Sequence, residues 1–189
     1  MLILLALSAC QEPPCECGCP PEVTQRIELR LAQMSKVQPK MSVAPGAAKR
    51  VIVCSADKPE GCTIDVPVTV VKDDQGKVTA CQVALPYCVV CMRKGKAGSP
   101  APVVTWQLTE DGKLTTGFVF ADNLGIDIKH AGATGKDDFR KLGVVEPGNQ
   151  FKWQAGPGRS DALGHEAQVY TVDGTVACSR YDPVIVNTD

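Results

Sequence analysis

The sequence has few aromatic residues, few histidines and no long apolar run after its first ten residues. Aromatic residues make up 5% of its 189 residues and histidine occurs only twice, which restricts histidine-based metal chemistry. Basic and acidic residues are balanced at 20 and 21, so a nucleic-acid partner, which usually requires a basic patch, is not expected. No later run approaches the roughly 20 apolar residues of a membrane-spanning helix.

Cysteine, in contrast, is abundant, with ten residues in the chain. The first of them, Cys10, ends an apolar run that begins at Leu2. As a helix this run would span about 12 Å, far less than the bilayer core of about 30 Å. Its length is instead typical of the apolar region of a signal peptide.

Residues Leu7-Ser8-Ala9-Cys10 resemble the lipobox of bacterial lipoproteins, in which Leu, a small residue and Gly or Ala precede the cysteine. All four positions match. The resemblance implies a signal peptide over residues 1–9, cleavage before Cys10 and covalent lipid on that cysteine, with no other cofactor. Two or three acyl chains give stable anchoring, which one chain does not, so the membrane is an expected partner.

Two further features of this segment bear on the compartment. No Lys or Arg precedes Cys10, although signal peptides open with basic residues, so we expect the true start codon to lie upstream. Gln11 stands where Asp commonly retains lipoproteins in the inner membrane. The resemblance therefore implies the cell envelope, at the outer membrane facing the periplasm. The alternative is a cytosolic protein with an apolar first strand, which the following Pro13 and Pro14 disfavour.

Residues 10–48 predict a lipid-anchored tether, because their first part is rich in proline, which fixes φ and favours an extended chain. Residues 23–37 allow two readings. Ile27, Leu31 and Met34 share one helical face, but apolar residues also alternate there as in a strand. We favour a short helix, since the intervening residues are good helix formers.

Residues 49–189 predict a mainly β domain, an antiparallel β-sandwich with hairpins. Short β-branched or alternating runs recur with turn signals between them, which is typical of sandwiches and barrels. The runs cover residues 50–54, 64–71, 77–85, 103–108, 114–120, 169–172, 175–178 and 183–186.

Two Asp-Gly pairs mark expected hairpins, Asp111-Gly112 and Asp173-Gly174. The second lies between β-branched runs and predicts a type I′ turn, in which both central residues have positive φ. Residues 129–149 contain no strand pattern, and 137–142 predict at most one helical turn.

The last residues, Asp182-Pro183-Val184-Ile185-Val186-Asn187, resemble a closing motif Asp-Pro-x-Ile-x-Asn of small proteobacterial proteins of unassigned function. The resemblance spans only the end of the chain. It implies a sandwich and no activity.

Six cysteines lie in the domain and are disulfide candidates: Cys54, Cys62, Cys81, Cys88, Cys91 and Cys178. An exported protein favours disulfides, although six cysteines allow 15 connectivities. We expect Cys54 and Cys62 to staple the turn-forming loop between them, and Cys81 and Cys178 to bridge two strand ends. Cys88 and Cys91 could pair with each other or with different partners.

The Cys88-Val89-Val90-Cys91 motif has two other readings. A CxxC pair can exchange disulfides at a helix N-terminus, but its valines favour a strand or turn. A zinc site would use Cys88 and Cys91 with Cys54 and Cys62, although the latter spacing is wide for a zinc knuckle. The tether cysteines, Cys15, Cys17 and Cys19, cannot all pair among themselves, so one must bridge elsewhere or stay unpaired.

No catalytic arrangement stands out. Ser160-Asp161 and His165-Glu166 are close in sequence, but no nucleophile elbow accompanies them, and neither this set nor His130 predicts an enzyme. Three functions remain, of which the least favoured is a hydrolase whose site the sequence does not reveal. The first is a lipid-anchored envelope protein whose β-sandwich serves as a non-enzymatic binding or structural module, with an envelope protein as partner. The alternative is a thiol redox or metal-binding envelope protein that uses Cys88 and Cys91.

Overall fold

The computed structural model describes residues 50–56, 62–85, 87–93, 95, 98–122, 124–128, 139–157, 163–178 and 184–188, together with Gln25, Glu28, Leu29 and Ala32. For 163–164 and 184–188 it describes the backbone alone. The described part of the chain is a β-sandwich, as the strand pattern predicts. Cys10 and the tether cysteines lie outside the described residues. The four described residues within 23–37 are all helical.

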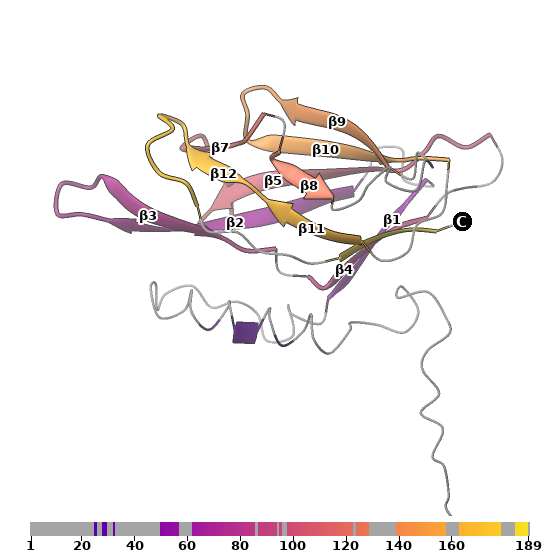
Figure 1. Cartoon of the computed structure of the whole chain (residues 1–189), viewed down its shortest axis with the longest axis horizontal. Coiled ribbons are helices and arrows are strands. Elements are labelled where there is room, and N and C mark those ends of the chain that lie inside the picture. The colour runs from indigo at the N-terminus through magenta and orange to yellow at the C-terminus, as the bar shows by residue number, and fades with distance from the viewer. Residues whose placement is uncertain are drawn as a thin grey trace, which may run out of the picture.

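Two sheets form the layers of the sandwich (Figure 1). Sheet I has the order β1 (Val51–Ser55), β4 (Val89–Arg93), β13 (Val184–Thr188), β11 (Leu163–Ala167) and β8 (Ile126–Ile128). Sheet II has the order β3 (Val78–Val83), β2 (Cys62–Lys72), β5 (Val103–Glu110), β10 (Gln150–Ala155) and β9 (Phe139–Val145), with β6 (Lys113–Leu114) paired to β5. A separate ribbon joins β7 (Phe118–Phe120) to β12 (Val169–Thr171).

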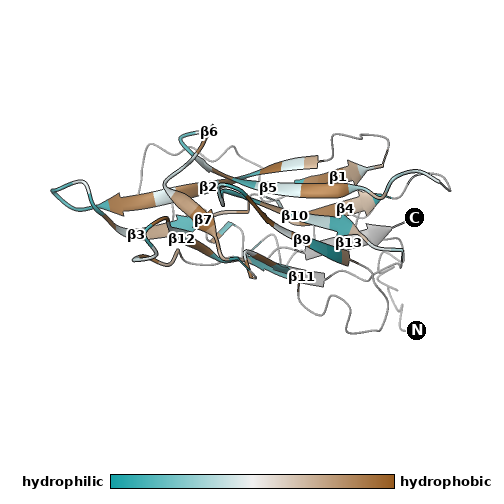
Figure 2. Ribbon diagram, turned by 90° about the horizontal axis from the view of Figure 1, so that it is seen from above, coloured by the Kyte–Doolittle hydropathy of each residue, from teal (hydrophilic) through white to brown (hydrophobic). Residues whose placement is uncertain are grey.

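Alternating apolar residues build the core between the sheets. In β2 the side chains of Ile64 and Val66 are buried while those of Thr63 and Asp65 are exposed. Successive side chains of a strand point to opposite faces, so this alternation turns the apolar set inward. Trp106 and Trp153 are both buried in this core. Figure 2 shows apolar strand segments and a hydrophilic tip on the hairpin that joins β2 to β3.

The strand pairing is mixed, whereas the sequence predicts an antiparallel sandwich. Most pairs are antiparallel, but β1 with β4, β4 with β13 and β2 with β5 are parallel. Two parallel neighbouring strands need a long connection between them, and no tight turn connects the strands of any of these three pairs. Turn motifs in the sequence predict hairpins, which join antiparallel strands. They therefore give no information on which strands pair in parallel.

The expectation for residues 129–149 is wrong in its second half, because β9 runs from Phe139 to Val145 where a helical turn was expected over 137–142. The register along β10 jumps from Gly143 to Lys141 and leaves Leu142 out, and Gly143 has a φ of 87°. This bulge interrupts the alternation of side chains, so the segment lacks the period of two that identifies a strand. Asp137 and Asp138 lie outside the described residues.

The two Asp-Gly turns differ. Asp111 and Gly112 have φ values of 52° and 74°, as a type I′ turn requires. At the second turn Gly174 has a φ of 71° but Asp173 is not in the positive region, so the expected type I′ turn is wrong there. Residues 175–178 form an isolated bridge from Ala177 to Tyr170 in place of a strand. The strands β4, β8, β10 and β11 have no counterpart among the expected runs.

Candidate functional site

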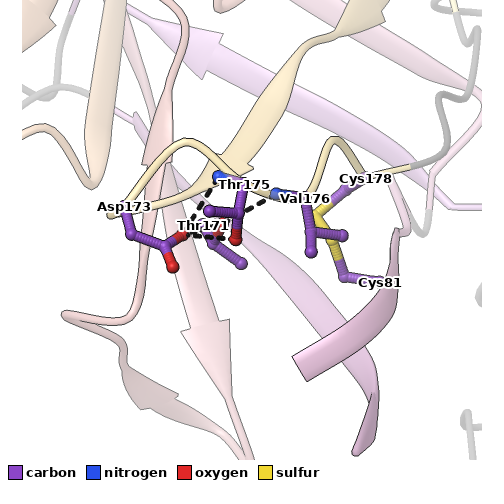
Figure 3. Close-up of a disulfide and its surroundings, with 6 residues drawn as sticks. All are labelled: Cys81, Thr171, Asp173, Thr175, Val176 and Cys178. Carbon is purple, nitrogen blue, oxygen red and sulfur yellow. Dashed lines mark hydrogen bonds between the residues drawn. A yellow bond between two sulfur atoms is a disulfide. The ribbon is translucent and has the colours of Figure 1, made fainter. Parts of the chain in front are cut away.

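Two disulfides join segments of the sandwich that are not paired as neighbouring strands. Cys54 of β1 bonds to Cys62 at the start of β2, with Cα atoms 5.2 Å apart. This bridge links sheet I to sheet II. Cys81 of β3 bonds to Cys178, with Cα atoms 4.6 Å apart (Figure 3). Both bridges are those expected from the sequence, the first because of local reach and the second because both residues end strand-like runs.

The turn that leads to Cys178 is fixed by one carboxylate. Asp173 Oδ1 accepts hydrogen bonds from Thr171 Oγ1 at 2.5 Å, from the Thr175 amide at 3.1 Å and from Thr175 Oγ1 at 2.9 Å (Figure 3). The hydroxyl of Thr171 in turn accepts from the Val176 amide. These donors favour the ionised form, so the side-chain hydrogen bond of Thr171 and those of Thr175 lower the pKa of Asp173 to about 2. The carboxylate therefore acts as the cap of a turn.

Cys88 and Cys91 are buried in the middle of sheet I. Both are 0% exposed and both are disulfide-bonded, although neither is joined to any of the other four domain cysteines. Cys88 precedes β4 and Cys91 lies within it, so the motif belongs to a strand. A redox-active CxxC needs an accessible sulfur, commonly at a helix N-terminus, and this site has neither property.

The four cysteines of the zinc alternative are not held as a set of thiolates. Cys54 and Cys62 are bonded to each other, and the sulfurs of Cys88 and Cys91 are also oxidised. Zinc binds deprotonated thiolate, so these bridges would first have to be reduced. Within the described residues no three His, Cys, Asp or Glu side chains gather as metal ligands.

A buried polar cluster crosses the core between the two sheets, and sequence reasoning did not anticipate it. The indole Nε1 of Trp106 donates to the hydroxyl of Tyr87 at 2.6 Å. That hydroxyl lies 2.8 Å from Nε2 of His165, whose ring stacks on Tyr87 with centroids 5.7 Å apart. All three side chains are fully buried. In the sequence, only the alternation of Leu163, His165 and Ala167 with Gly164 and Glu166 indicates that His165 points inward.

Burial holds His165 in its neutral form. Desolvation lowers the pKa of His165 from 6.5 to about 3, because the charged imidazolium would lose its hydration in the core. Its Nδ1 has no hydrogen-bond partner in the described part of the chain. The imidazole of His165 is fully buried, so it is not exposed as the base of the imagined hydrolase would be. Ser160 and Asp161, the other members of that imagined set, lie outside the described residues, as does His130.

The hydrogen-bond chain predicts which nitrogen of His165 carries the proton. Trp106 can only donate, so the Tyr87 oxygen accepts that bond, and the hydroxyl proton of Tyr87 can then be donated to Nε2 of His165. We expect the neutral tautomer with the proton on Nδ1, and nitrogen NMR of the imidazole at pH 7 should show Nε2 as the unprotonated nitrogen. A protonated Nε2 would contradict this direction of bonding. A His130→Gln variant leaves His165 as the only histidine and assigns the signal.

Polar side chains form a row across the outer face of sheet II. Gln107 of β5 is the register partner of Asp65 in β2 and of Gln150 in β10. The Gln107 Nε2 donates to Asp65 Oδ1 at 2.7 Å, and Gln150 Nε2 donates to Gln107 Oε1 at 3.5 Å. This row leaves amide and carboxylate groups on a solvent-facing sheet surface.

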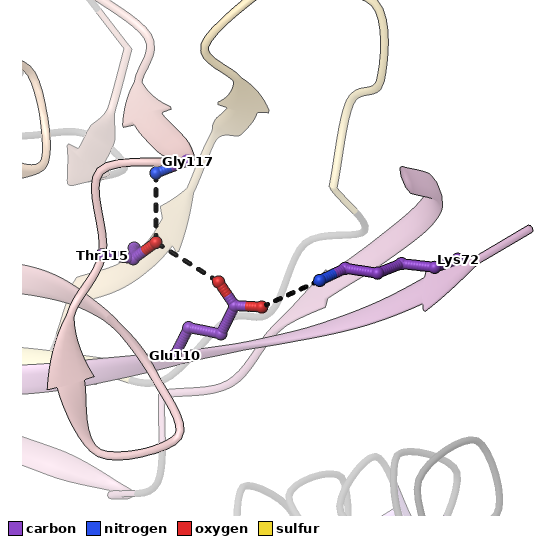
Figure 4. Close-up of polar contacts among 4 residues, drawn as sticks. All are labelled: Lys72, Glu110, Thr115 and Gly117. Carbon is purple, nitrogen blue, oxygen red and sulfur yellow. Dashed lines mark hydrogen bonds and ion pairs between the residues drawn. The ribbon is translucent and has the colours of Figure 1, made fainter. Parts of the chain in front are cut away.

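A second polar group lies where β2 and β5 end. Glu110 forms an ion pair with Lys72, with Oε1 and Nζ 3.7 Å apart, and accepts from Thr115 Oγ1 at 3.5 Å (Figure 4). Thr115 Oγ1 also accepts from the Gly117 amide at 3.1 Å. An ion pair between partly exposed side chains contributes little to stability, so this group serves mainly to order the loop after β6.

The comparisons with known proteins add no assignment. Among the described residues, no helix has the length and apolar character needed to cross a membrane. No protein-family model matches the sequence. A search of curated proteins likewise finds no significant match.

Proposed function

We propose that the chain is a lipid-anchored protein of the bacterial envelope whose β-sandwich acts as a non-enzymatic binding or structural module. The observation that carries the proposal is that all six cysteines of the domain are in disulfides. Disulfides persist in exported proteins and are rare in reducing cytosol. The lipobox-like residues that end at Cys10 supply the anchor, with the outer membrane facing the periplasm as the expected site.

The described surface supports a module that binds through polar contacts. The row of Asp65, Gln107 and Gln150 offers hydrogen-bond donors and acceptors on a rigid sheet. An envelope protein is the expected partner. The alternative, redox or metal chemistry at Cys88 and Cys91, is less well supported, because both sulfurs are buried and oxidised.

The anchor is tested by a chromosomal Cys10→Ser substitution in the native host. We expect the wild-type protein in the membrane fraction, with an intact mass of residues 10–189 plus a diacylglyceryl group and an acyl chain. The Cys10→Ser protein should lose the lipid mass and leave the detergent-soluble membrane fraction or accumulate as uncleaved precursor. As a matched control, Cys15→Ser should keep the lipid mass, because it lies outside the lipobox. A wild-type mass without lipid at Cys10 would overturn the proposal.

A further inference from the structure

The strand β4 is covered on both of its faces. Every residue from Val89 to Met92 is 0% exposed. Met92 is the register partner of Cys54, whose bridge to Cys62 directs it toward sheet II. Side chains alternate along a strand, so Cys91, next to Met92, faces the outside of the sandwich.

The outer face of sheet I is therefore covered at Cys91. Val53 of the edge strand β1 is the register partner of Cys91 and shares its face, yet Val53 is 43% exposed while Cys91 is fully buried. The strands beside β4, namely β1 and β13, lie in the same sheet and cannot cover that face. Another part of the chain must lie over Cys91.

Cys88 and Cys91 are not bonded to each other, because the bridges between described residues are Cys54–Cys62 and Cys81–Cys178. The Cys88 amide donates to the Arg50 carbonyl at 3.0 Å, just before the first register pair of β1 and β4, Val51 and Val89. Both residues are nevertheless disulfide-bonded, and the other four domain cysteines are paired among themselves. The cysteines that remain are Cys10, Cys15, Cys17 and Cys19.

We propose that two of the tether cysteines, Cys15, Cys17 and Cys19, form disulfides with Cys88 and Cys91. These bridges fix the N-terminal segment, residues 11–49, on the outer face of sheet I. One tether cysteine is then left over, while Cys10 stays available for lipid. The bridges do not require lipidation, so this inference stands independently of the proposed anchor.

The position of Cys88 places its sulfur beside the entry of the N-terminal segment. Its Sγ lies 3.4 Å from the carbonyl oxygen of Arg50, the residue that leads into β1. Because β1 is the neighbour of β4, a chain that enters at Arg50 can come from the outer face of sheet I without crossing the sandwich.

The helical segment within residues 23–37 has the exposed polar stripe and the apolar stripe of a helix that packs on a sheet. Its described residues, Gln25, Glu28, Leu29 and Ala32, are all exposed and form one helical stripe, at i, i+3, i+4 and i+7. In Figure 1 this indigo segment lies on the β4 side of the sandwich, away from β9 and β10. The sequence period sets the apolar residues of this helix, Ile27, Leu31 and Met34, on the opposite stripe, where they can pack on sheet I.

Formation of each bridge is an oxidation. Two thiols lose two protons and two electrons as the S–S bond forms, and an oxidised protein disulfide of the exporting compartment accepts the electrons through a mixed disulfide and becomes a dithiol. The result is a sandwich held at a fixed orientation to its N-terminal segment. A lipid on Cys10 would then hold the sandwich close to the membrane surface, with few free tether residues between them.

Mapping of the disulfides in the mature, unreduced protein tests the proposal. Trypsin cleaves after Arg26, Lys77, Arg93, Arg159 and Arg180, so residues 78–93 contain Cys81, Cys88 and Cys91 in one peptide. We expect a three-chain species that joins 78–93 to 160–180, through Cys81 and Cys178, and to the tether peptide that ends at Arg26. A species that contains only 78–93 and 160–180 would show that neither Cys88 nor Cys91 is bridged to the tether and would overturn the proposal. So would a protein that migrates as a disulfide-linked dimer through these two residues.

A thiol count in denaturant gives a second readout on a triple variant, Cys15→Ser with Cys17→Ser and Cys19→Ser. Without tether partners, Cys88 and Cys91 should appear as two free thiols. If they bonded to each other, the count at these positions would be zero. The Cys54–Cys62 and Cys81–Cys178 bridges serve as internal controls, since both should stay oxidised. If the triple variant does not fold, the peptide map of the wild type still decides.

Discussion

Removal of the bridge between Cys81 and Cys178 should lower the free energy of unfolding by about 4 to 5 kcal/mol. The two cysteines are 97 residues apart, so the bridge closes most of the domain into one loop in the unfolded chain. In the chain-entropy account a loop of about 100 residues is worth about 4.7 kcal/mol. A double substitution, Cys81→Ala with Cys178→Ala, removes both sulfurs and avoids a free thiol.

The Cys54–Cys62 bridge provides a matched comparison. Its sequence separation is 8, for which the same relation gives about 2.5 kcal/mol. Urea unfolding of the wild type and of the two double alanine variants should therefore rank the losses, with the Cys81–Cys178 pair larger by about 2 kcal/mol. Equal losses would mean that restriction of the unfolded chain is not the main effect. A Thr116→Ala change at an exposed position checks that the assay is insensitive to a neutral substitution.

Acidification should destabilise the protein through His165. The folded-state pKa of His165 is lowered by burial from 6.5 to about 3, so the unfolded chain takes up a proton over a pH range in which the folded chain does not. Stability from this group is fully present above pH 6.5 and is lost as pH falls toward 3. The slope in this window is about 1.4 kcal/mol per pH unit, which gives a loss of about 3 kcal/mol by pH 4.

A His165→Gln variant isolates this effect, because glutamine does not titrate and its carbonyl oxygen can still accept from Tyr87. The difference in free energy of unfolding between wild type and variant should shrink steadily from pH 7 to pH 4, as measured by urea unfolding at each pH. Asp173, whose pKa is lowered to about 2, loses its contribution mainly below pH 4 and so does not obscure the window. His130→Gln is the matched control for the second histidine. A difference that stays constant with pH would show that His165 titrates normally.

Local patterns in the sequence identify several strands. They also identify the two disulfides whose partners are both described, Cys54–Cys62 and Cys81–Cys178. The β-branched alternation of residues 64–71 corresponds to β2, and the Asp111-Gly112 pair marks the type I′ turn between β5 and β6. Cys54 and Cys62 could be paired from the sequence because only a short turn-forming loop separates them. Each of these features depends on neighbours within a few residues, so the chain reports them directly.

Other features depend on contacts between distant segments. The bulge at Leu142 breaks the alternation of β9, and only pairing with β10 makes this segment a strand. The cluster of Tyr87, Trp106 and His165 joins residues from three strands or loops, and nothing near His165 in the sequence signals that its pKa is low.

The cysteines show the same division. Their number and the lipobox-like residues before Cys10 follow from the sequence by itself, as do the β class of the domain and the turn at Asp111. The tertiary structure decided that β4 lies between β1 and β13 in parallel, that Cys88 and Cys91 are buried there, and that neither belongs to the two bridges between described residues. The physical reason is that strand periodicity and turn geometry are set by adjacent residues, whereas burial and sheet order arise from packing of segments far apart in the chain.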